Sequence, residues 1–331
     1  MKKTFTFLSL VLSLFFFSSC SNFSINKTTS IVISFDSAIH SKAVTYNADD
    51  VSYFVVSIEP KVQNDIKVDI AAGEISAEFS DLQIGTYKIK VSAFREDERK
   101  IAFGNSGPVK VKAGETTDVP ITMKLLADYS TCIVGDIILN DGTACTADEY
   151  VTGSNSAVAV IVRAAEGDTP ALGVGIVQDQ GGLAWCNNGT VGVNKNISTL
   201  VGTTRTGFTD GQNGWELLKA ACSDAEDPTN YPAWEYSLSY ASKNDLGEDF
   251  ATGWYLPTLA ELKVIYDNRT TVNESLSKIG GDQFAKKSYW SCNQHDSIGY
   301  ASYKLDFNDG TSDYLSKSWN DGYVCSVRVF N

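Results

Sequence analysis

The sequence predicts an α+β chain in two parts, the first built of strands alone and the second of strands and helices. Apolar and polar residues alternate with period two over several short runs between residues 31 and 126, which is typical of half-buried strands. Helices are expected only from about Gly214 onward. All six tryptophans and six of the seven cysteines lie beyond residue 131, so the two parts also differ in composition.

The composition of the 331 residues excludes several classes of protein. Hydrophobic residues make up 43%, enough for packed cores, and the length suggests two domains. Lys and Arg number 27 against 40 Asp and Glu, and the formal net charge is -13. This acid excess opposes the phosphate backbone, so we expect no nucleic-acid partner. The only histidines are His40 and His295, which argues against a multi-histidine metal site.

The first twenty residues have the pattern of an export signal. Lys2 and Lys3 precede an apolar run over residues 4–17, which is too short for a comfortable membrane span. Small residues then lead into Cys20, a pattern that resembles the bacterial lipobox. The alternative is an ordinary signal peptide with an incidental cysteine.

The lipobox resemblance implies a lipoprotein signal peptide over residues 1–19, a lipidated tether over residues 20–30 and a lipid anchor on Cys20. Several acyl chains would hold the chain stably on a membrane. Ser21, in place of an acidic residue, implies export to the outer membrane and the cell surface. No later segment of the sequence reaches 18 apolar residues, so we expect an anchored chain that does not span the membrane.

Residues 31–126 predict an all-β domain. Tyr87, Ile89, Val91 and Ala93 alternate with polar residues, and similar runs occur at 109–112 and 119–123. Turn signals separate these runs at 72–73, 85, 105–108 and 113–114. About seven short strands in a hundred residues indicate an immunoglobulin-like β-sandwich. We expect it to be a spacer, and the alternative is a second adhesive surface.

Residues 132–331 predict strands followed by helices and then strands again. Early strands are expected at 134–139, 157–162 and 173–177, and late strands at 288–291, 303–307 and 323–330. Three helices are expected to begin at Gly214, Pro232 and Leu259.

Local patterns specify the helix boundaries further. Asp210 or Asn213 is placed to cap the first helix. The second helix is expected to present one face, formed by Trp234, Ser237, Leu238 and Ala241. Thr258 with Glu261, and again Thr271 with Glu274, form capping-box patterns, and 280–281 is a glycine pair that ends a helix.

An ordered series of blocks in this second part resembles the C-type lectin-like domain of the formylglycine-generating-enzyme type. The blocks are GDIILNDGT, FTDGQNGWELLKAAC, GWYLPTLAEL, SYWSC, YKLDFNDG and YVCSVRVF. The resemblance covers about residues 132–331. It implies a C-type lectin-like fold in which two helices and a small antiparallel sheet support a long irregular surface, and it implies a ligand-binding domain.

A closer similarity is to the variable proteins of diversity-generating retroelements, and among these to the treponemal variable lipoproteins. In that family the last 40–50 residues form the binding face, which here is about residues 288–330. Framework positions would include Trp290, Phe307, Gly310, Lys317 and Trp319. Replacement of the adenines in AAY codons cannot produce codons for Lys, Glu, Gln, Met or Trp. Residues 295–303 contain none of these five residue types, which is consistent with variable positions. An ordinary polar loop is the alternative.

The resemblance implies a set of ligand-binding residues rich in tyrosine, serine and aspartate, as in an antibody paratope. Tyrosines of this set are expected to anchor a partner, and the aspartates to accept hydrogen bonds from a basic ligand. For Tyr303 a place in the core is the competing expectation. The set is His295, Asp296, Ser297, Ile298, Gly299, Tyr300, Ser302, Tyr303, Ser312, Asp313, Tyr314, Leu315, Ser316, Asn320, Asp321 and Tyr323.

The expected function is therefore noncovalent binding of an unknown protein or glycan, without a cofactor or a catalytic residue. A calcium-dependent lectin is one alternative, because Trp319-Asn320-Asp321 matches a calcium-binding tripeptide, but the companion loop has His295 where proline is needed. A scaffold or adhesin without variability is another. An enzyme is not expected, since that chemistry needs paired reactive cysteines and a metal.

Six cysteines lie beyond Cys20. In an exported chain they allow up to three disulfides with 15 possible pairings, or they remain buried free thiols. The sequence leaves both possibilities open. These cysteines are Cys132, Cys145, Cys186, Cys222, Cys292 and Cys325.

Overall fold

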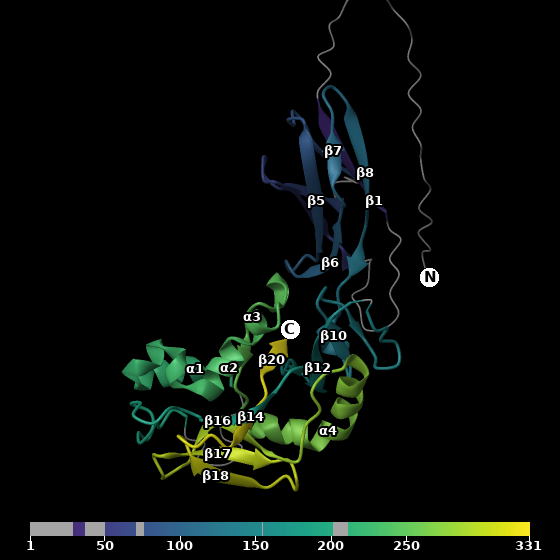
Figure 1. Cartoon of the computed structure of the whole chain (residues 1–331). Helices are drawn as coiled ribbons and strands as arrows, with labels where there is room; N and C mark the ends of the chain where they lie inside the picture. Colours follow the sequence, from purple (N-terminus) through teal and green to yellow (C-terminus); the bar gives the residue numbers. More distant parts are fainter. Residues whose placement is uncertain (1–28, 37–49, 71–75, 154, 201–210) are drawn as a thin grey trace, which may run out of the picture.

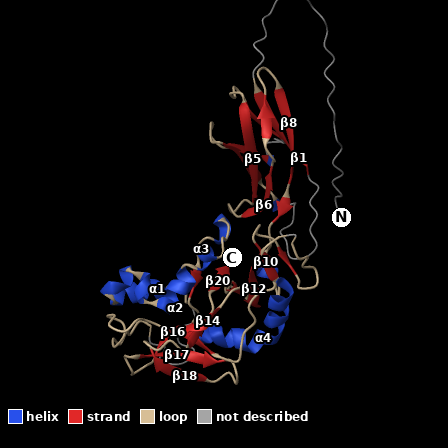
Figure 2. Ribbon diagram, viewed as in Figure 1, coloured by secondary structure: helices blue, strands red, loops and turns tan. Residues whose placement is uncertain are grey.

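The computed structural model describes residues 29–36, 50–70, 76–153, 155–200 and 211–331. The chain is β-rich with few helices, as the colouring in Figure 2 shows. The strands β1–β9 form one end of an elongated molecule, and β16, β17 and β18 lie at the opposite end (Figure 1). The predicted signal peptide, Cys20 and nearly all of the predicted tether lie outside the described residues. No helix within the described ranges is long and apolar enough to cross a membrane.

Two sheets form the first part of the chain. The smaller has the order β4-β1-β8, with β1 parallel to β8, and the larger has the order β3-β2-β5-β6-β9 with β7 also paired to β5. The bounds are β1 Ser30–Asp36, β2 Tyr53–Glu59, β3 Ile66–Asp69, β4 Ser76–Phe79, β5 Gly85–Phe94, β6 Lys100–Asn105, β7 Val109–Val111, β8 Thr116–Thr122 and β9 Lys124–Leu125.

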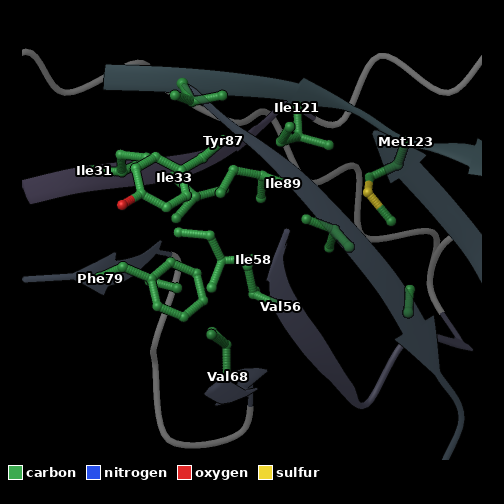
Figure 3. Close-up of a cluster of buried hydrophobic side chains, with 14 of the residues drawn as sticks. Ile31, Ile33, Val56, Ile58, Val68, Phe79, Tyr87, Ile89, Ile121 and Met123 are labelled. Atoms are coloured by element: carbon green, nitrogen blue, oxygen red, sulfur yellow. The ribbon is translucent and has the colours of Figure 1, made fainter. Parts of the chain in front are cut away.

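One hydrophobic core joins these two sheets. Ile31 and Ile33 of β1 pack with Val56 and Ile58 of β2 and with Ile89 of β5 (Figure 3). The alternation expected from the sequence is present in β5, where every second side chain from Tyr87 to Ala93 is buried. The turn signal at residues 72–73 lies outside the described ranges. The described residues of this part form nine strands where the sequence indicated about seven, because several of the strands are only two to four residues long.

Two further sheets form the rest of the chain. The first has the order β11-β10-β12-β13-β20-β15 and the second the order β14-β19-β16-β17-β18. The bounds are β10 Ile137–Leu139, β11 Ala144–Cys145, β12 Ala157–Arg163, β13 Ala171–Gly175, β14 Asp179–Leu183, β15 Trp254–Tyr255, β16 Ser288–Gln294, β17 Ala301–Asp306, β18 Ser312–Ser316, β19 Gly322–Val324 and β20 Val327–Phe330.

Three of the four α-helices in the described residues begin at the predicted residues, and α3 was not predicted. Thr258 and Glu261 form a complete capping box at the start of α4, and Gly280 ends this helix in the left-handed conformation. The bounds are α1 Gly214–Ala221, α2 Pro232–Leu238, α3 Tyr240–Lys243 and α4 Leu259–Ile279, with short 3-10 helices at Tyr129–Thr131, Ser223–Glu226, Pro228–Asn230 and Glu248–Phe250.

Several local expectations were wrong. Thr271 and Glu274 do not start a new helix, because α4 runs through them without a break. Leu238 is 38% exposed, because the helical path changes at Ser239, between α2 and α3. Asn213 stands at the cap position of α1 without a side-chain hydrogen bond, and Asp210 lies outside the described residues. The single strand expected over 323–330 is divided into β19 and β20.

The two parts of the chain meet at a short junction around Leu126. The backbone N–H of Leu126 donates to the carbonyl of Ile101, and the next N–H, of Ala127, donates to the carbonyl of Gly142. An exposed ion pair of 3.2 Å joins Lys124 and Asp141. The junction therefore links β6 of the first part directly to the turn that follows β10.

Candidate ligand-binding surface

The five-stranded sheet that ends in β18 is covered on both faces. Tyr289, Leu305 and Phe307 pack on one face with residues of α4, and Phe307 lies 4.6 Å from Tyr289 between ring centroids. On the other face Trp290 and Cys292 join a cluster with residues of α1 and α2. The sheet is thus a packed support, and its free parts are its edge and its end loops.

Two tryptophans tie β16 to β14 and to the residues that follow β14. The indole Nε1 of Trp290 donates to the carbonyl of Leu183 at 2.7 Å. The indole Nε1 of Trp185 donates to the carbonyl of Ser291 at 3.0 Å, and both tryptophans are fully buried. Because a buried indole N–H needs a partner, these bonds fix the orientation of two large core side chains.

The loop between β16 and β17 is held by His295. Its Nδ1 accepts hydrogen bonds from the backbone N–H groups of Ser297 and Ile298, both at 3.2 Å. Its ring stacks on Tyr303 with centroids 5.2 Å apart and meets Tyr314 edge-on at 4.4 Å. Half-buried His295 therefore orders the loop and connects β17 with β18, and it is only partly available to a ligand.

The structure places most of the predicted binding residues at the surface, although two of them are buried. The exposed residues are Asp296, Ser297, Tyr300, Asp313, Tyr314, Asn320 and Asp321. The half-buried residues are His295, Ile298, Gly299, Ser312, Leu315, Ser316 and Tyr323.

Ser302 and Tyr303 are the buried pair, and their assignment to the binding surface was wrong. Ser302 is 0% and Tyr303 is 9% exposed. Both lie in β17, which has β16 on one side and β18 on the other. The Tyr303 ring is also covered by His295, so the competing expectation of a core tyrosine is the correct one.

Trp319 is the large exposed residue that the sequence analysis left out of the site. It is 60% exposed, against 53% for Tyr300 and 44% for Tyr314. Its backbone N–H donates to the carbonyl of Ser316, which places it directly after β18. We assigned it to the framework from the resemblance, but its position among Ser, Asn and Asp residues indicated a solvent-exposed turn.

A second loop, residues 187–197, lies beside this surface. The carbonyl of Asn194 approaches Gly299 so closely that a Cβ there would lie 2.6 Å from it. Val191 is 44% exposed, and Asn194, Lys195 and Asn196 are exposed as well. The sequence analysis gave no role to this loop, because only folding brings it next to residues a hundred positions later.

The exposed acidic groups do not form a metal site. Asp321 and Asn320 of the calcium-like tripeptide are both exposed. Among the residues that the structure describes, no group of three or more His, Cys, Asp or Glu side chains could hold a metal ion. Calcium requires six to eight oxygen ligands.

All six cysteines of the described chain are free thiols. Burial raises the pKa of the Cys132 thiol to about 12 and that of Cys186 to about 11, and it also raises the pKa of Cys325. The possibility of disulfides is thus not realised in this structure. Thiols that are both buried and protonated are poor nucleophiles.

The fold defined by these elements is a β-rich α+β fold with several sheets. No protein-family model matches the sequence, and no curated protein matches it either. A solved structure of a fimbrial protein from Bacteroides ovatus is similar with a TM-score of 0.52 at 13% identity, over 92% of this chain and 71% of the other. At this identity the similarity concerns the fold alone.

A protein of the DUF4876 family from Bacteroides thetaiotaomicron also matches, at 12% identity, over 48% of this chain and 34% of the other. Its TM-score of 0.23 is too low to indicate a shared fold.

Proposed function

We propose that the chain is a surface-displayed lipoprotein that binds a protein target noncovalently through the end of a C-type lectin-like domain. The proposed lipid anchor is Cys20, and the strands β1–β9 form an immunoglobulin-like spacer. The name of the fimbrial neighbour supports a location at the cell surface. The proposed variable positions are the exposed ones in the loop 295–300 and in β18.

The observation that carries this proposal is that three large aromatic side chains within residues 300–319 are exposed at the edge and end loops of a packed support. Tyr300, Tyr314 and Trp319 are each at least 44% exposed. Tyrosine and tryptophan supply much of the binding energy in protein interfaces, since they offer large faces at a low entropic cost.

The charges around these aromatic residues favour a partner with basic groups. Asp296, Asp313 and Asp321 are exposed at this end of the molecule. The ammonium group of Lys317 is buried, so it adds little to the surface. Arginine and lysine of a partner could pair with the aspartates and lie over the aromatic rings.

A selection from a displayed random-peptide library, with the whole mature chain as bait, tests this proposal. The bait carries Cys20→Ser so that it stays soluble. We expect most independent clones to lose binding when Tyr300, Tyr314 and Trp319 are all replaced by alanine. The melting temperature should stay within about 2 °C of the unsubstituted bait, because these side chains contribute little to the core.

The matched control is a triple variant with alanine at Ile84, Ile133 and Val151, which are 73%, 61% and 65% exposed on other parts of the chain. Most clones should keep binding to it. Equal losses with both variants would mean that the aromatic group is no preferred site, and the proposal would then fail. An adjacent reverse transcriptase gene and a near-copy template repeat would test the variability separately.

A further inference from the structure

Lys317 follows β18 directly and its side chain is 0% exposed. Its Nζ donates hydrogen bonds to the carbonyls of Gly192 and Lys195, at 2.9 and 3.1 Å, and to Oε1 of Gln294 at 2.8 Å. An ammonium group has three N–H donors, so all three are used. The Nζ also lies 4.9 Å from the centroid of the Trp185 ring, within the range of a cation–π contact.

This buried charge has no carboxylate partner within the part of the chain that the structure describes. The titratable groups that face it are the thiols of Cys186 and Cys222, and burial lowers the pKa of Lys317 to about 8. On the far side of Gly192, the hydroxyl of Tyr231 accepts a hydrogen bond from the N–H of Gly192 and donates one to Asp224. Burying an ammonium group is costly unless hydrogen bonds compensate, so the buried position of Lys317 needs an explanation.

The same residue connects three separate segments. Its backbone N–H donates to the carbonyl of Tyr300, and its carbonyl accepts from the N–H of Cys186. Its ammonium group holds the loop 192–197 by main-chain carbonyls. All four of these bonds, to Tyr300, Cys186 and the two loop carbonyls, involve only main-chain atoms of the partner segments. None of them depends on which side chain the partner segment carries.

Gln294 completes the arrangement. It is also 0% exposed, and its Oε1 accepts from the N–H of Ile197 at 3.0 Å as well as from Lys317. Its Nε2 donates to Oδ1 of Asn196 at 3.1 Å. The pair therefore fixes the loop 192–197 against the strand that leads into the loop 295–300.

We propose that Lys317 is a positioning residue, whose buried ammonium group fixes the loop 192–197 beside Tyr300 so that this loop becomes a second part of the binding surface. The role of the surface in binding rests on the proposed function, whereas the holding of the loop does not. The exposed side chains of Asn194 and of Val191, just before the loop, can then change without loss of its geometry. With Lys195 they would be the contacts that the loop adds.

The first test replaces Lys317 with methionine, which removes the charge but keeps a long side chain. The carbonyls of Gly192 and Lys195 lose their donor, so the loop should open. Hydrogen exchange measured by mass spectrometry at pH 7 should become about tenfold faster in peptides covering 192–197. Peptides from β12, which lies in another core cluster, should change by less than about twofold. Equal acceleration of exchange in the loop and in β12 would mean that Lys317 stabilises the core in general. Unchanged exchange in the loop would contradict the proposal outright.

The second test does not depend on whether Lys317→Met folds. Exchange protection of 192–197 in the unsubstituted chain, corrected for intrinsic rates, should fall as the pH rises through about 8, because the neutral amine has only two N–H donors. Gln294→Glu places a carboxylate next to the ammonium group and should move this fall upward by more than about one pH unit. The thiol of Cys186 stays protonated in this range, since its pKa is raised to about 11.

The proposal would be overturned if protection fell at the same pH in Gln294→Glu and in the unsubstituted chain. It would also be overturned if protection fell in neither protein. Both tests read the loop itself and need no ligand. Failure of the peptide selection would therefore count against the proposed function, and failure of the exchange experiments against the role of Lys317.

Discussion

Replacing Trp290 with alanine should lower the free energy of unfolding by about 3–5 kcal/mol, the range for a buried tryptophan in a well-packed core. Trp290 is 0% exposed, and its Nε1 is the donor to the carbonyl of Leu183. The backbone of Gly322 packs directly on the indole, where an added Cβ would overlap with the ring. The substitution would thus leave a large cavity and an unpaired carbonyl between β14 and β16. Urea denaturation followed by circular dichroism measures the loss.

The matched control is the same substitution at Trp319, which is 60% exposed on the neighbouring turn. It should change the free energy of unfolding by less than about 0.5 kcal/mol, as is usual for surface positions. Similar losses at the two tryptophans would contradict the division into a packed support and a replaceable surface.

The free energy of unfolding should fall steeply above pH 9. Cys132, Cys186 and Cys325 are buried, and burial raises the pKa of each thiol above the ordinary value of 9.0. Below pH 9 these thiols are protonated in both the folded and the unfolded protein, so their contribution to stability is fully present there. As the pH rises beyond 9 the unfolded state ionises first, and each thiol removes up to about 1.4 kcal/mol per pH unit.

Lys317 acts in the opposite direction, because burial lowers its pKa to about 8 and stability from this group rises between pH 8 and 10.5. One lysine cannot offset three thiols, since each group changes stability by the same maximum of about 1.4 kcal/mol per pH unit. Tyr240, whose pKa burial raises to about 12, adds to the loss beyond pH 10. Stability should therefore decline overall from pH 9 to pH 11.

Urea denaturation at pH 8, 9, 10 and 11 measures this decline, and Cys325→Ala should make it shallower, because one of the thiols that ionise first in the unfolded state is then missing. The unfolded Cys20→Ser chain should also release six reactive thiols to a disulfide reagent, the number of free cysteines in the structure. A flat profile up to pH 11, or fewer than six thiols, would show that the cysteines are paired in the protein.

The sequence predicted those elements whose signals are local. The capping box of Thr258 and Glu261 depends on residues three positions apart, and it forms as expected. The alternation in β5 depends only on the period of the strand. Thr271 and Glu274 carry the same local pattern as the true cap but lie inside α4, where packing of the whole helix on the sheet decides its length.

The candidate surface was predictable only in part, because exposure depends on partners distant in the sequence. Tyr300 and Tyr303 have similar local surroundings, yet the ring of His295 covers one and leaves the other exposed. The role of Lys317 depends on carbonyls more than a hundred residues earlier in the chain. A lysine in a strand-turn segment is usually solvated, so no local signal indicated a buried charge.

Protease challenge of a displayed library tests most directly whether a rigid support carries replaceable residues. The library is randomised at the exposed positions Asp296, Ser297, Tyr300, Asp313 and Tyr314. We expect most members to resist cleavage as well as the parent chain does. A library of equal size randomised at Tyr289, Trp290, Ser291, Cys292 and Leu305, all 2% exposed or less, should lose nearly all resistant members. Equal depletion of the two libraries would mean that the surface residues are needed for folding, and the account of a diversifiable binding surface would be contradicted.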